Sequence, residues 1–281
     1  MPKCGSLRCC GRTLPPRICA RRWSSSARAK GASVDADPQV TPGAAEAPKK
    51  SDLGVRVVSA VVMLAVAGAA LWAGGLWLDL FVAVVAFGVF VEYVRLVGKI
   101  AGNPARLSSM VIFGAIYIGW GGLALAVMPE PLMLAVLGLV ICTDTGAYFT
   151  GRSLGGPKIA PKISPSKTWS GLFGGMAAAG IWAALVVLSA SYLVSAIGPT
   201  GPSVAAALEV ANLGMAAIAG AVLAVFAQVG DFYESWLKRR AGVKDSSRLI
   251  PGHGGLFDRV DGLLPVAIIV GTAWAATQAG L

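Results

Sequence analysis

The segment RLSSMVIFGAIYIGWGGLALAVMPE (residues 106–130) decides the fold class of this chain. Residues 110–128 carry no charged side chain, and a helix of these 19 residues would extend about 28 Å, close to the roughly 30 Å hydrocarbon core of a bilayer. Arg106 precedes this run, whereas Pro129 and Glu130 follow it without a Lys or Arg. An uncharged run of this length with a basic flank at one end is typical of a membrane-spanning helix.

The same pattern recurs along the chain. Hydrophobic residues make up 56% of the sequence and charged residues 14%, against about 25% charged in soluble proteins. We therefore predict an all-α, polytopic integral membrane protein with about seven transmembrane helices, at residues 55–73, 76–94, 110–128, 131–149, 171–197, 204–229 and 263–279.

Basic residues occupy alternate connections between these spans. The basic positions are Lys49, Lys50 and Arg56, then Arg95, Lys99 and Arg106, then Arg152, Lys158, Lys162 and Lys167, and then residues 238–248. The connections at residues 74–75, 129–130 and 198–203 contain no Lys or Arg. Because basic loops stay in the cytoplasm, this alternation predicts a cytoplasmic N-terminus and, with seven spans, an outside C-terminus.

Residues 1–50 differ in composition from the rest of the chain. They hold 10 Lys and Arg against 3 Asp and Glu, whereas residues 51–281 hold 14 against 11, so most of the net charge of +10 lies in this tail. The excess therefore does not indicate nucleic-acid binding. We predict a disordered basic tail, read as an upstream extension, ahead of a transmembrane catalytic domain at residues 51–281. The alternative is an organellar transit peptide, since the tail is rich in Arg and Ser and poor in acids.

Acidic side chains gather at one predicted membrane depth, at the cytoplasmic ends of the spans. These are Asp144, Asp231, Glu234, Asp258 and Asp261. Asp231 and Glu234 are three residues apart, as are Asp258 and Asp261, so each pair would share a helix face. Clustered carboxylates suit Mg²⁺, which binds through one or two carboxylates and substrate phosphate. Simple charge compensation of nearby arginines is the alternative, and it is weaker for four aspartates at matched depth.

Two glycine-containing basic segments flank these acids. Residues 151–171 (GRSLGGPKIAPKISPSKTWSG) combine three lysines with hydroxyl side chains, and residues 252–255 (GHGG) offer backbone N–H groups ahead of a helix start. Basic side chains, glycine-rich backbone and carboxylates together favour an enzyme that acts on phosphate with Mg²⁺. Contact with anionic lipid heads would explain the basic residues but not the aspartates, the glycines or the histidine.

The segment SWLKRRAGVKDSSRLIPGHGGLFDRVD (residues 235–261) closely resembles the signature of the phosphatidate cytidylyltransferases, also called CDP-diacylglycerol synthases. Residues 144–152 (DTGAYFTGR), 163–171 (ISPSKTWSG) and 229–235 (VGDFYES) are similar to other blocks of that family. The resemblance covers about residues 53–279. It implies that CTP and phosphatidate give CDP-diacylglycerol and pyrophosphate for phospholipid biosynthesis, with Mg²⁺ and room for a second, monovalent or divalent cation. By analogy it also suggests a homodimer.

The resemblance also implies roles for particular residues. Asp231 and Asp258 are the first choice as metal ligands, with Asp261 and Asp144 as further ligands or as partners of the ligands. The basic residues would hold the phosphates of CTP or of the lipid: Lys167, Lys238, Arg239, Lys244 and Arg259. Ser164 and Ser235 would add hydrogen bonds, and His253, Gly254 and Gly255 would shape the nucleotide site.

Other functions remain open at this stage. A transporter would carry its charges near the bilayer midplane, and a non-catalytic scaffold would leave the charged segment unexplained. A CDP-alcohol phosphotransferase would carry a different aspartate motif, which this chain lacks. The polyprenol kinases resemble the chain more distantly, and the choice of substrate would separate them from the main prediction. The expected location is the bacterial inner membrane, with the site facing the cytoplasm and in contact with membrane lipids. If the tail is a transit peptide, the location becomes an organellar membrane.

Overall fold

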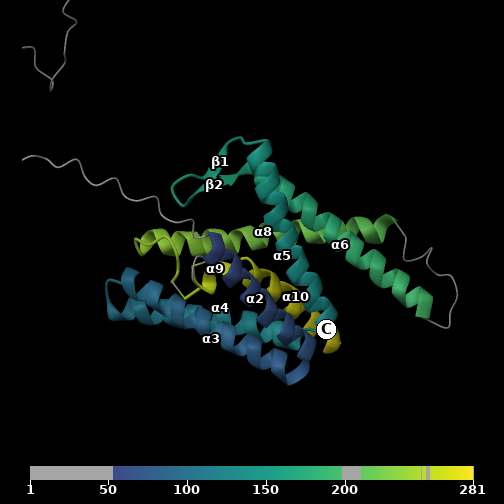
Figure 1. Ribbon diagram of the computed structural model, residues 1–281, viewed down its shortest axis with the longest axis horizontal. Helices are drawn as coiled ribbons and strands as arrows, with labels where there is room; N and C mark the ends of the chain where they lie inside the picture. The colour runs from purple at the N-terminus through teal and green to yellow at the C-terminus, as the bar shows by residue number, and fades with distance from the viewer. Residues whose placement is uncertain (1–52, 198–209, 248, 251–253, 281) are drawn as a thin grey trace, which may run out of the picture. The chain divides into compact units, whose positions relative to one another are not determined.

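The computed structural model describes residues 53–197, 210–247, 249–250 and 254–280, all of which belong to one compact unit, Ser51–Leu281. The predicted basic tail and His253 lie outside the described residues, so their predicted roles stay predictions. The elements are, in order, α2 (Leu53–Ala73), α3 (Gly75–Ile100), α4 (Pro104–Val127), α5 (Glu130–Ser153), β1 (Lys158–Ala160), β2 (Ser164–Thr168), α6 (Trp169–Ile197), α8 (Val210–Arg240), α9 (Phe257–Val260) and α10 (Leu263–Gln278) (Figure 1).

Six of the described helices are long and apolar enough to cross a membrane: α2, α3, α4, α5, α6 and α8. The length and composition of these helices are those of a polytopic integral membrane protein, as predicted. The seventh predicted span is also a helix, α10, but it has only 16 residues. At 1.5 Å per residue it extends about 24 Å, less than the roughly 30 Å of a full crossing.

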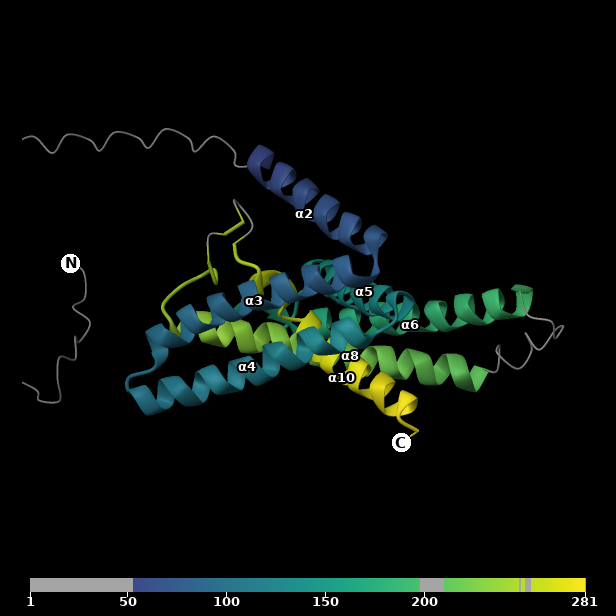
Figure 2. The ribbon, with the colours of Figure 1, turned by 90° about the horizontal axis from the view of Figure 1, so that it is seen from below.

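Local sequence sets several helix boundaries. The side chain of Asn103 accepts a hydrogen bond of 2.8 Å from the Arg106 N–H, and Pro104 occupies the first turn of α4, so this helix begins with a standard cap. Gly74 joins α2 to α3 with a φ of 60°, a conformation that glycine adopts without strain. Figure 2 shows α2 next to α3 and apart from α6.

The helix that contains the sixth predicted span, α8, continues beyond residue 229 to Arg240. The additional turns are amphipathic, and a Glu234–Lys238 ion pair at the i,i+4 spacing supports them. The helix thereby carries Asp231, Glu234 and Lys238 on one continuous, rigid element rather than on a loop.

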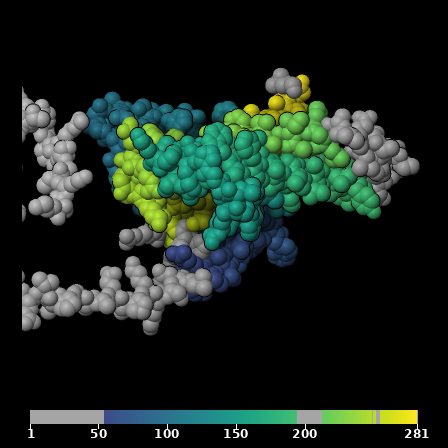
Figure 3. All heavy atoms as spheres, turned by 90° about the horizontal axis from the view of Figure 1, so that it is seen from above, coloured from purple at the N-terminus to yellow at the C-terminus, as the bar shows by residue number. Residues whose placement is uncertain are grey.

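The all-α prediction needs one correction between α5 and α6. Residues 158–168 form a two-stranded antiparallel sheet, in which Lys158 pairs with Thr168 and Ala160 with Ser164. Gly155 and Gly156, with φ of 62° and 106°, end the helical path, and the chain then folds back as a hairpin. Figure 3 shows the teal segment that includes this hairpin against the yellow-green end of α8, and β2 contacts α8.

Small residues allow the central helices to approach closely. A side chain at Gly220 of α8 would lie 2.5 Å from the carbonyl oxygen of Ala179 in α6, and one at Gly180 would lie 2.8 Å from that of Ala217. Close backbone contact of this kind holds membrane helices together where the hydrophobic effect cannot. α10 packs against both α4 and α8, and its Val266 and Ala267 are fully buried. The start of α10, next to Asp261, is therefore fixed against α8.

Candidate active site

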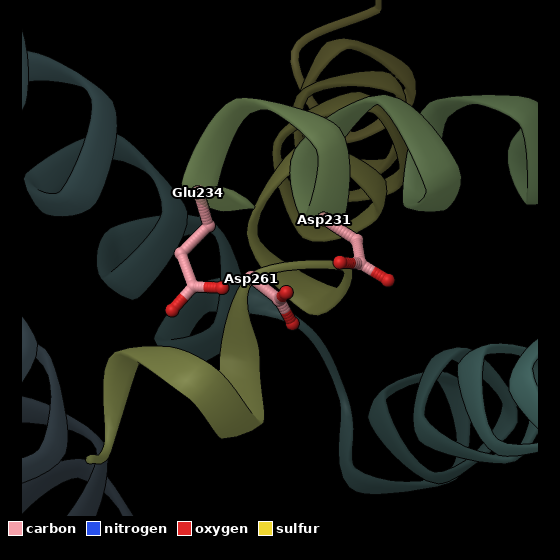
Figure 4. Close-up of side chains that lie close together, drawn as sticks. All are labelled: Asp231, Glu234 and Asp261. Carbon is pink, nitrogen blue, oxygen red and sulfur yellow. The ribbon is translucent and has the colours of Figure 1, made fainter. Parts of the chain in front are cut away.

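Three carboxylates meet where α8 passes the start of α10. Asp231 and Glu234 project from the same face of α8, and Asp261 approaches them from the segment between α9 and α10 (Figure 4). One oxygen atom from each residue lies within 4.8 Å of the others. Asp231 and Glu234 are three residues apart on the helix, as the sequence predicted.

This carboxylate cluster (Asp231, Glu234 and Asp261) has the properties of a cation site. Glu234 is 1% exposed, and its Oε1 has no hydrogen-bond partner among the described residues. Burial and the negative charge of Asp231 raise the pKa of Asp261 to about 7. A buried oxygen without a donor, beside carboxylates that disfavour one another's charge, fits a bound metal ion, and oxygen donors are those that Mg²⁺ prefers.

Two lysines pair with the acidic residues of this region, Lys167 from the hairpin and Lys238 from α8 itself. Lys167 of β2 forms an ion pair with Asp231 and donates a hydrogen bond of 2.9 Å to Gln228. Lys238 lies 2.5 Å from Glu234 and 2.7 Å from Asp258. The hairpin and the segment at residues 241–262 are thus each held to α8 by an ion pair.

Asp258 lies beside the carboxylate cluster and is already satisfied. Besides Lys238, it accepts hydrogen bonds from the Ser246 N–H (3.0 Å), the Ser246 hydroxyl (3.1 Å) and the Gly255 N–H (2.9 Å). Burial alone would raise the pKa of Asp258, but hydrogen bonds from Lys238 and from the Gly255 N–H, with the positive charge of Lys238, lower it below its usual range. The geometry therefore groups Glu234 and Asp261 with Asp231. Asp258 instead makes the contacts of a residue that fixes the segment at residues 241–262, the loop between α8 and α10.

Glu92 of α3 holds the other side of the same loop. Its carboxylate is 3% exposed and accepts four hydrogen bonds, from the hydroxyls of Ser246 (2.8 Å) and Ser247 (2.6 Å) and from the N–H groups of Leu256 (3.0 Å) and Phe257 (2.9 Å). Of the predicted anion-binding segment at residues 252–255, the Gly255 N–H donates to Asp258, and the next two N–H groups along the chain donate to Glu92.

Two polar cavities adjoin at this place. The acidic cavity has a volume of about 280 Å³ and is lined by Asp144, Asp231, Glu234, Lys238, Asp245, Asp258, Arg259 and Asp261. The basic cavity has a volume of about 410 Å³, and its polar lining includes Asp144, Arg152, Lys158, Ser166, Lys167, Thr168 and Gln228. Asp144 of α5 lines both cavities, so the acidic cavity and the basic cavity are neighbours.

The remaining predicted residues surround these cavities at different distances. Ser164 and Ser235 are buried, and Ser235 lies at 3.5 Å from Asp231. Arg239 donates instead to the carbonyl oxygen of Ile163 at 3.2 Å, which ties α8 to the hairpin, and Lys244 is exposed in the following loop. Gly254 has a φ of 83° and pairs with Ile250, so it shapes the loop through its backbone.

Sequence reasoning missed two carboxylates. Glu234 was noted for its depth but was not included among the proposed ligands, although its spacing from Asp231 marked it. Glu92 was not singled out, because it lies inside an apolar run far from the charged segments. An ionisable residue within a membrane span is itself a signal, since such groups are costly unless they have partners.

The fold and the site define a class: a helical membrane protein with a carboxylate cluster and a basic cavity at the polar ends of its helices. The comparison with known proteins then narrows this class. The model of the cytidylyltransferase family matches residues 102–276. The chain belongs to this family, which confirms the resemblance found in its motifs.

Individual relatives carry the name phosphatidate cytidylyltransferase. The protein from Pseudomonas aeruginosa is 35% identical over 215 residues, covering 75% of this chain and 70% of that protein. The protein from Rickettsia bellii is 31% identical over 233 residues, covering 79% and 90%. The protein from Brucella melitensis is 44% identical over 163 residues, or 56% of this chain. The chain spans about half the length of this last relative, 54%.

Proposed function

We propose that this protein transfers a cytidylyl group from CTP to phosphatidate, giving CDP-diacylglycerol and pyrophosphate. The observation that carries the proposal is the carboxylate cluster beside the basic cavity, joined by Asp144, at the ends of apolar helices. Such a place admits a charged nucleotide from water and a lipid phosphate from the bilayer. The names of the relatives supply the nucleotide and the lipid.

The reaction needs alignment and charge neutralisation more than a strong base. A phosphate oxygen of phosphatidate attacks the α-phosphorus of CTP, and the bond from that phosphorus to the bridging oxygen breaks as pyrophosphate leaves with the electron pair. Lys167 and Lys158 are placed in the basic cavity to bind the nucleotide phosphates, and Arg259 is placed in the acidic cavity to meet the lipid phosphate. Holding two anions in line is the main catalytic contribution in phosphoryl transfer.

Mg²⁺ is part of the proposal, with Asp231, Glu234 and Asp261 as the residues that would hold it. When bound, the ion would neutralise negative charge that develops on the phosphoryl oxygens. Lys167 and Lys238 keep the carboxylates in place by direct ion pairs, and Asp258 positions the loop. The proposal adds Glu234 and Asp261 to Asp231, and the pair Asp231 and Asp258 that the resemblance implied stays a prediction.

The proposed topology has seven spans, with the N-terminus in the cytoplasm, the C-terminus outside and α10 as the short last crossing. The basic connections support this orientation through the positive-inside rule, which puts both cavities at the cytoplasmic face. A bacterial inner membrane is the proposed location, and a homodimer is the proposed assembly. Cysteine accessibility in spheroplasts, with single cysteines at Ser153 and Gly280, would test the orientation. Labelling of both positions from the same side would contradict it.

A substrate panel tests the proposed activity. Purified protein with Mg²⁺, CTP and phosphatidate should release pyrophosphate and form a CDP-lipid, detected by a coupled phosphate assay and by mass spectrometry. ATP or dCTP in place of CTP, and polyprenol or an alcohol in place of phosphatidate, separate the proposed enzyme from kinases and other phosphotransferases. Turnover of ATP with a polyprenol, without turnover of CTP, would assign the site to a kinase.

Removal of divalent cations should abolish this activity. With EDTA the three carboxylates of the cluster are left to repel the phosphates of both substrates, so turnover should fall to background, and added Mg²⁺ should restore it. The measurement is the initial rate across a Mg²⁺ titration. An EDTA-treated enzyme that keeps its full rate would remove the cation from the proposal.

The variant Asp258→Asn should lose activity by roughly 10- to 100-fold, the range found when groups that orient metal ligands are changed. The new amide would place an N–H donor against the Lys238 ammonium. The ion pair that links the loop to α8 would then be lost. The matched control is Asp79→Asn, because Asp79 is an exposed acid that lines neither the acidic nor the basic cavity. Equal rates for both variants would show that the contacts of Asp258 are dispensable.

A further inference from the structure

A third cavity lies among the apolar helices and plays no part in the reaction described above. This apolar groove, about 450 Å³ in volume, is lined by one face of α2 and one face of α3, with contributions from α4, α5, α9, α10 and the segment before α9. The lining residues of α2 are Val62, Met63, Val66, Ala67 and Leu71, and those of α3 are Leu78, Phe81, Val82, Val85, Ala86 and Val89. The volume lies within the range of about 300–1,000 Å³ that is usual for ligand pockets. α2 packs chiefly on α3 and diverges from it beyond the turn that joins them (Figure 2). The groove between these two helices is therefore accessible to a ligand.

Arg259 connects the apolar groove to the proposed site. It is the charged residue among the described residues that line the groove, and it also lines the acidic cavity, next to Asp258 and Asp261. Val260 of α9 and Leu256, the residue just before α9, line the groove as well. The two cavities thus share a wall, with a guanidinium group where apolar lining gives way to polar lining.

The length of the groove corresponds to one leaflet. The five lining residues of α2, from Val62 to Leu71, span about 14 Å along the helix, and half of a hydrocarbon core is about 15 Å. A chain whose polar end lies at the membrane surface beside Arg259 would fill the groove and end near the turn between α2 and α3. This geometry matches an acyl chain that hangs from a phosphate at the interface.

We propose that the apolar groove binds one acyl chain of the phosphomonoester lipid substrate, with the lipid phosphate near Arg259. This proposal rests on the proposed function and deepens it, because it assigns a place to the apolar part of the substrate. A chain gains little by leaving the bilayer for an equally apolar groove, so the benefit comes from close packing and from alignment of the attached phosphate. Selectivity for chain length and shape should follow.

Small residues set the width of the groove. Ala67 on α2, Ala86 on α3 and Gly122 on α4 all line it, and a side chain added at Gly122 would lie 3.1 Å from the Cβ of Ala86. A bulky residue at Ala67 would therefore occupy the path of the acyl chain. Ala69 is exposed on the opposite face of the same helix, so it offers a matched position outside the groove.

The test compares Ala67→Phe with Ala69→Phe, using dioleoyl and dihexanoyl phosphatidate with CTP. Ala67→Phe should lower kcat/KM for the dioleoyl lipid about tenfold, the cost expected when a packed space is overfilled. The dihexanoyl lipid, whose chains end before Ala67, should react with each variant as with the unmodified protein. An equal loss with both lipids, or an equal loss in the Ala69→Phe control, would overturn the proposal.

A second measurement does not depend on turnover. Phosphatidate with a diazirine at the end of one acyl chain should crosslink to residues 62–71 or 78–89 of the full-length protein. Excess dioleoyl phosphatidate should suppress this labelling, and the same amount of dioleoyl phosphatidylcholine should not. Equal suppression by both lipids would show that the groove binds membrane lipids without selectivity, and would overturn the proposal. If the protein shows specific labelling but does not turn over CTP, the proposed function is refuted, whereas the binding of an acyl chain in the groove is supported.

Discussion

Asp261→Asn is expected to remove nearly all activity while leaving the fold intact. Changes to groups that merely orient metal ligands cost about 10- to 100-fold, so loss of a direct ligand should cost at least about 100-fold. The amide keeps the shape of the carboxylate, and its oxygen can still accept the 2.9 Å hydrogen bond from the Gly262 N–H. What it removes is one negative charge from the carboxylate cluster, and with it the affinity for a cation.

The stability of the same variant should change in the opposite direction. The pKa of Asp261 is raised above its ordinary value, so at pH 8 the ionised side chain is less favourable in the folded protein than in the unfolded chain. Replacement by a neutral amide removes this penalty. Without Mg²⁺ at pH 8, the variant should therefore melt at the same temperature as the unmodified protein or above it.

The measurements are initial rates over a Mg²⁺ titration and thermal unfolding in EDTA. Asp79→Asn serves as the matched control, because Asp79 is exposed and lies near Glu130, beside the turn between α4 and α5. The control should keep the activity of the unmodified protein. Activity of Asp261→Asn within a factor of about three of the control would exclude a ligand role for this residue, given the size of the expected loss.

Glu92→Gln should give the second large effect, through the loop rather than through the site itself. Each carboxylate oxygen of Glu92 accepts one serine hydroxyl and one backbone N–H. An amide can accept on one side only, so one buried N–H at the start of α9 would face another donor. An unsatisfied buried group costs about 1–3 kcal/mol, and the loop that carries Asp258 would loosen.

Two readouts identify this effect. Hydrogen exchange at Leu256 and Phe257 should become faster, because their amide protection depends on the Glu92 carboxylate. The rate of CDP-lipid formation should fall by about 10- to 100-fold, the range for groups that orient a site. Glu130→Gln is the control with the same chemical change at an exposed position. Unchanged exchange at these two amides in Glu92→Gln would show that the carboxylate does not hold the loop.

Much of this fold could be predicted from the sequence, because membrane-spanning helices can be recognised by their amino-acid composition. Long uncharged runs have few alternatives in a bilayer, where every backbone polar group needs an internal partner. The end of α8 was less readable, because residues 230–240 are polar and continue the helix through side-chain pairs such as Glu234–Lys238. The hairpin escaped prediction because short strands with proline give no clear periodic signal.

The sequence predicts which charged residues gather in this region, but not which of them contact one another. The motif placed Asp231, Asp258 and Asp261 in one region, but their partners depend on how α3, α8 and the loop meet in space. Asp258 turns toward Lys238 and Ser246, whereas Asp261 turns toward Asp231. Spacing along the chain cannot separate these outcomes, because α9 ends between the two aspartates.

The order of charges along α8 also restricts how the chain can assemble. The hairpin brings a lysine, Lys167, to an acidic position of α8, and the loop brings an aspartate, Asp258, to the basic position Lys238 about two turns further on. If either segment docked at the other's position, lysine would face lysine or aspartate would face aspartate at the membrane boundary. Such like-charge contacts are strongly unfavourable in a poorly solvated place. The order of acidic and basic residues along α8 thus determines where the hairpin and the loop each bind, although these two segments are far apart in the sequence.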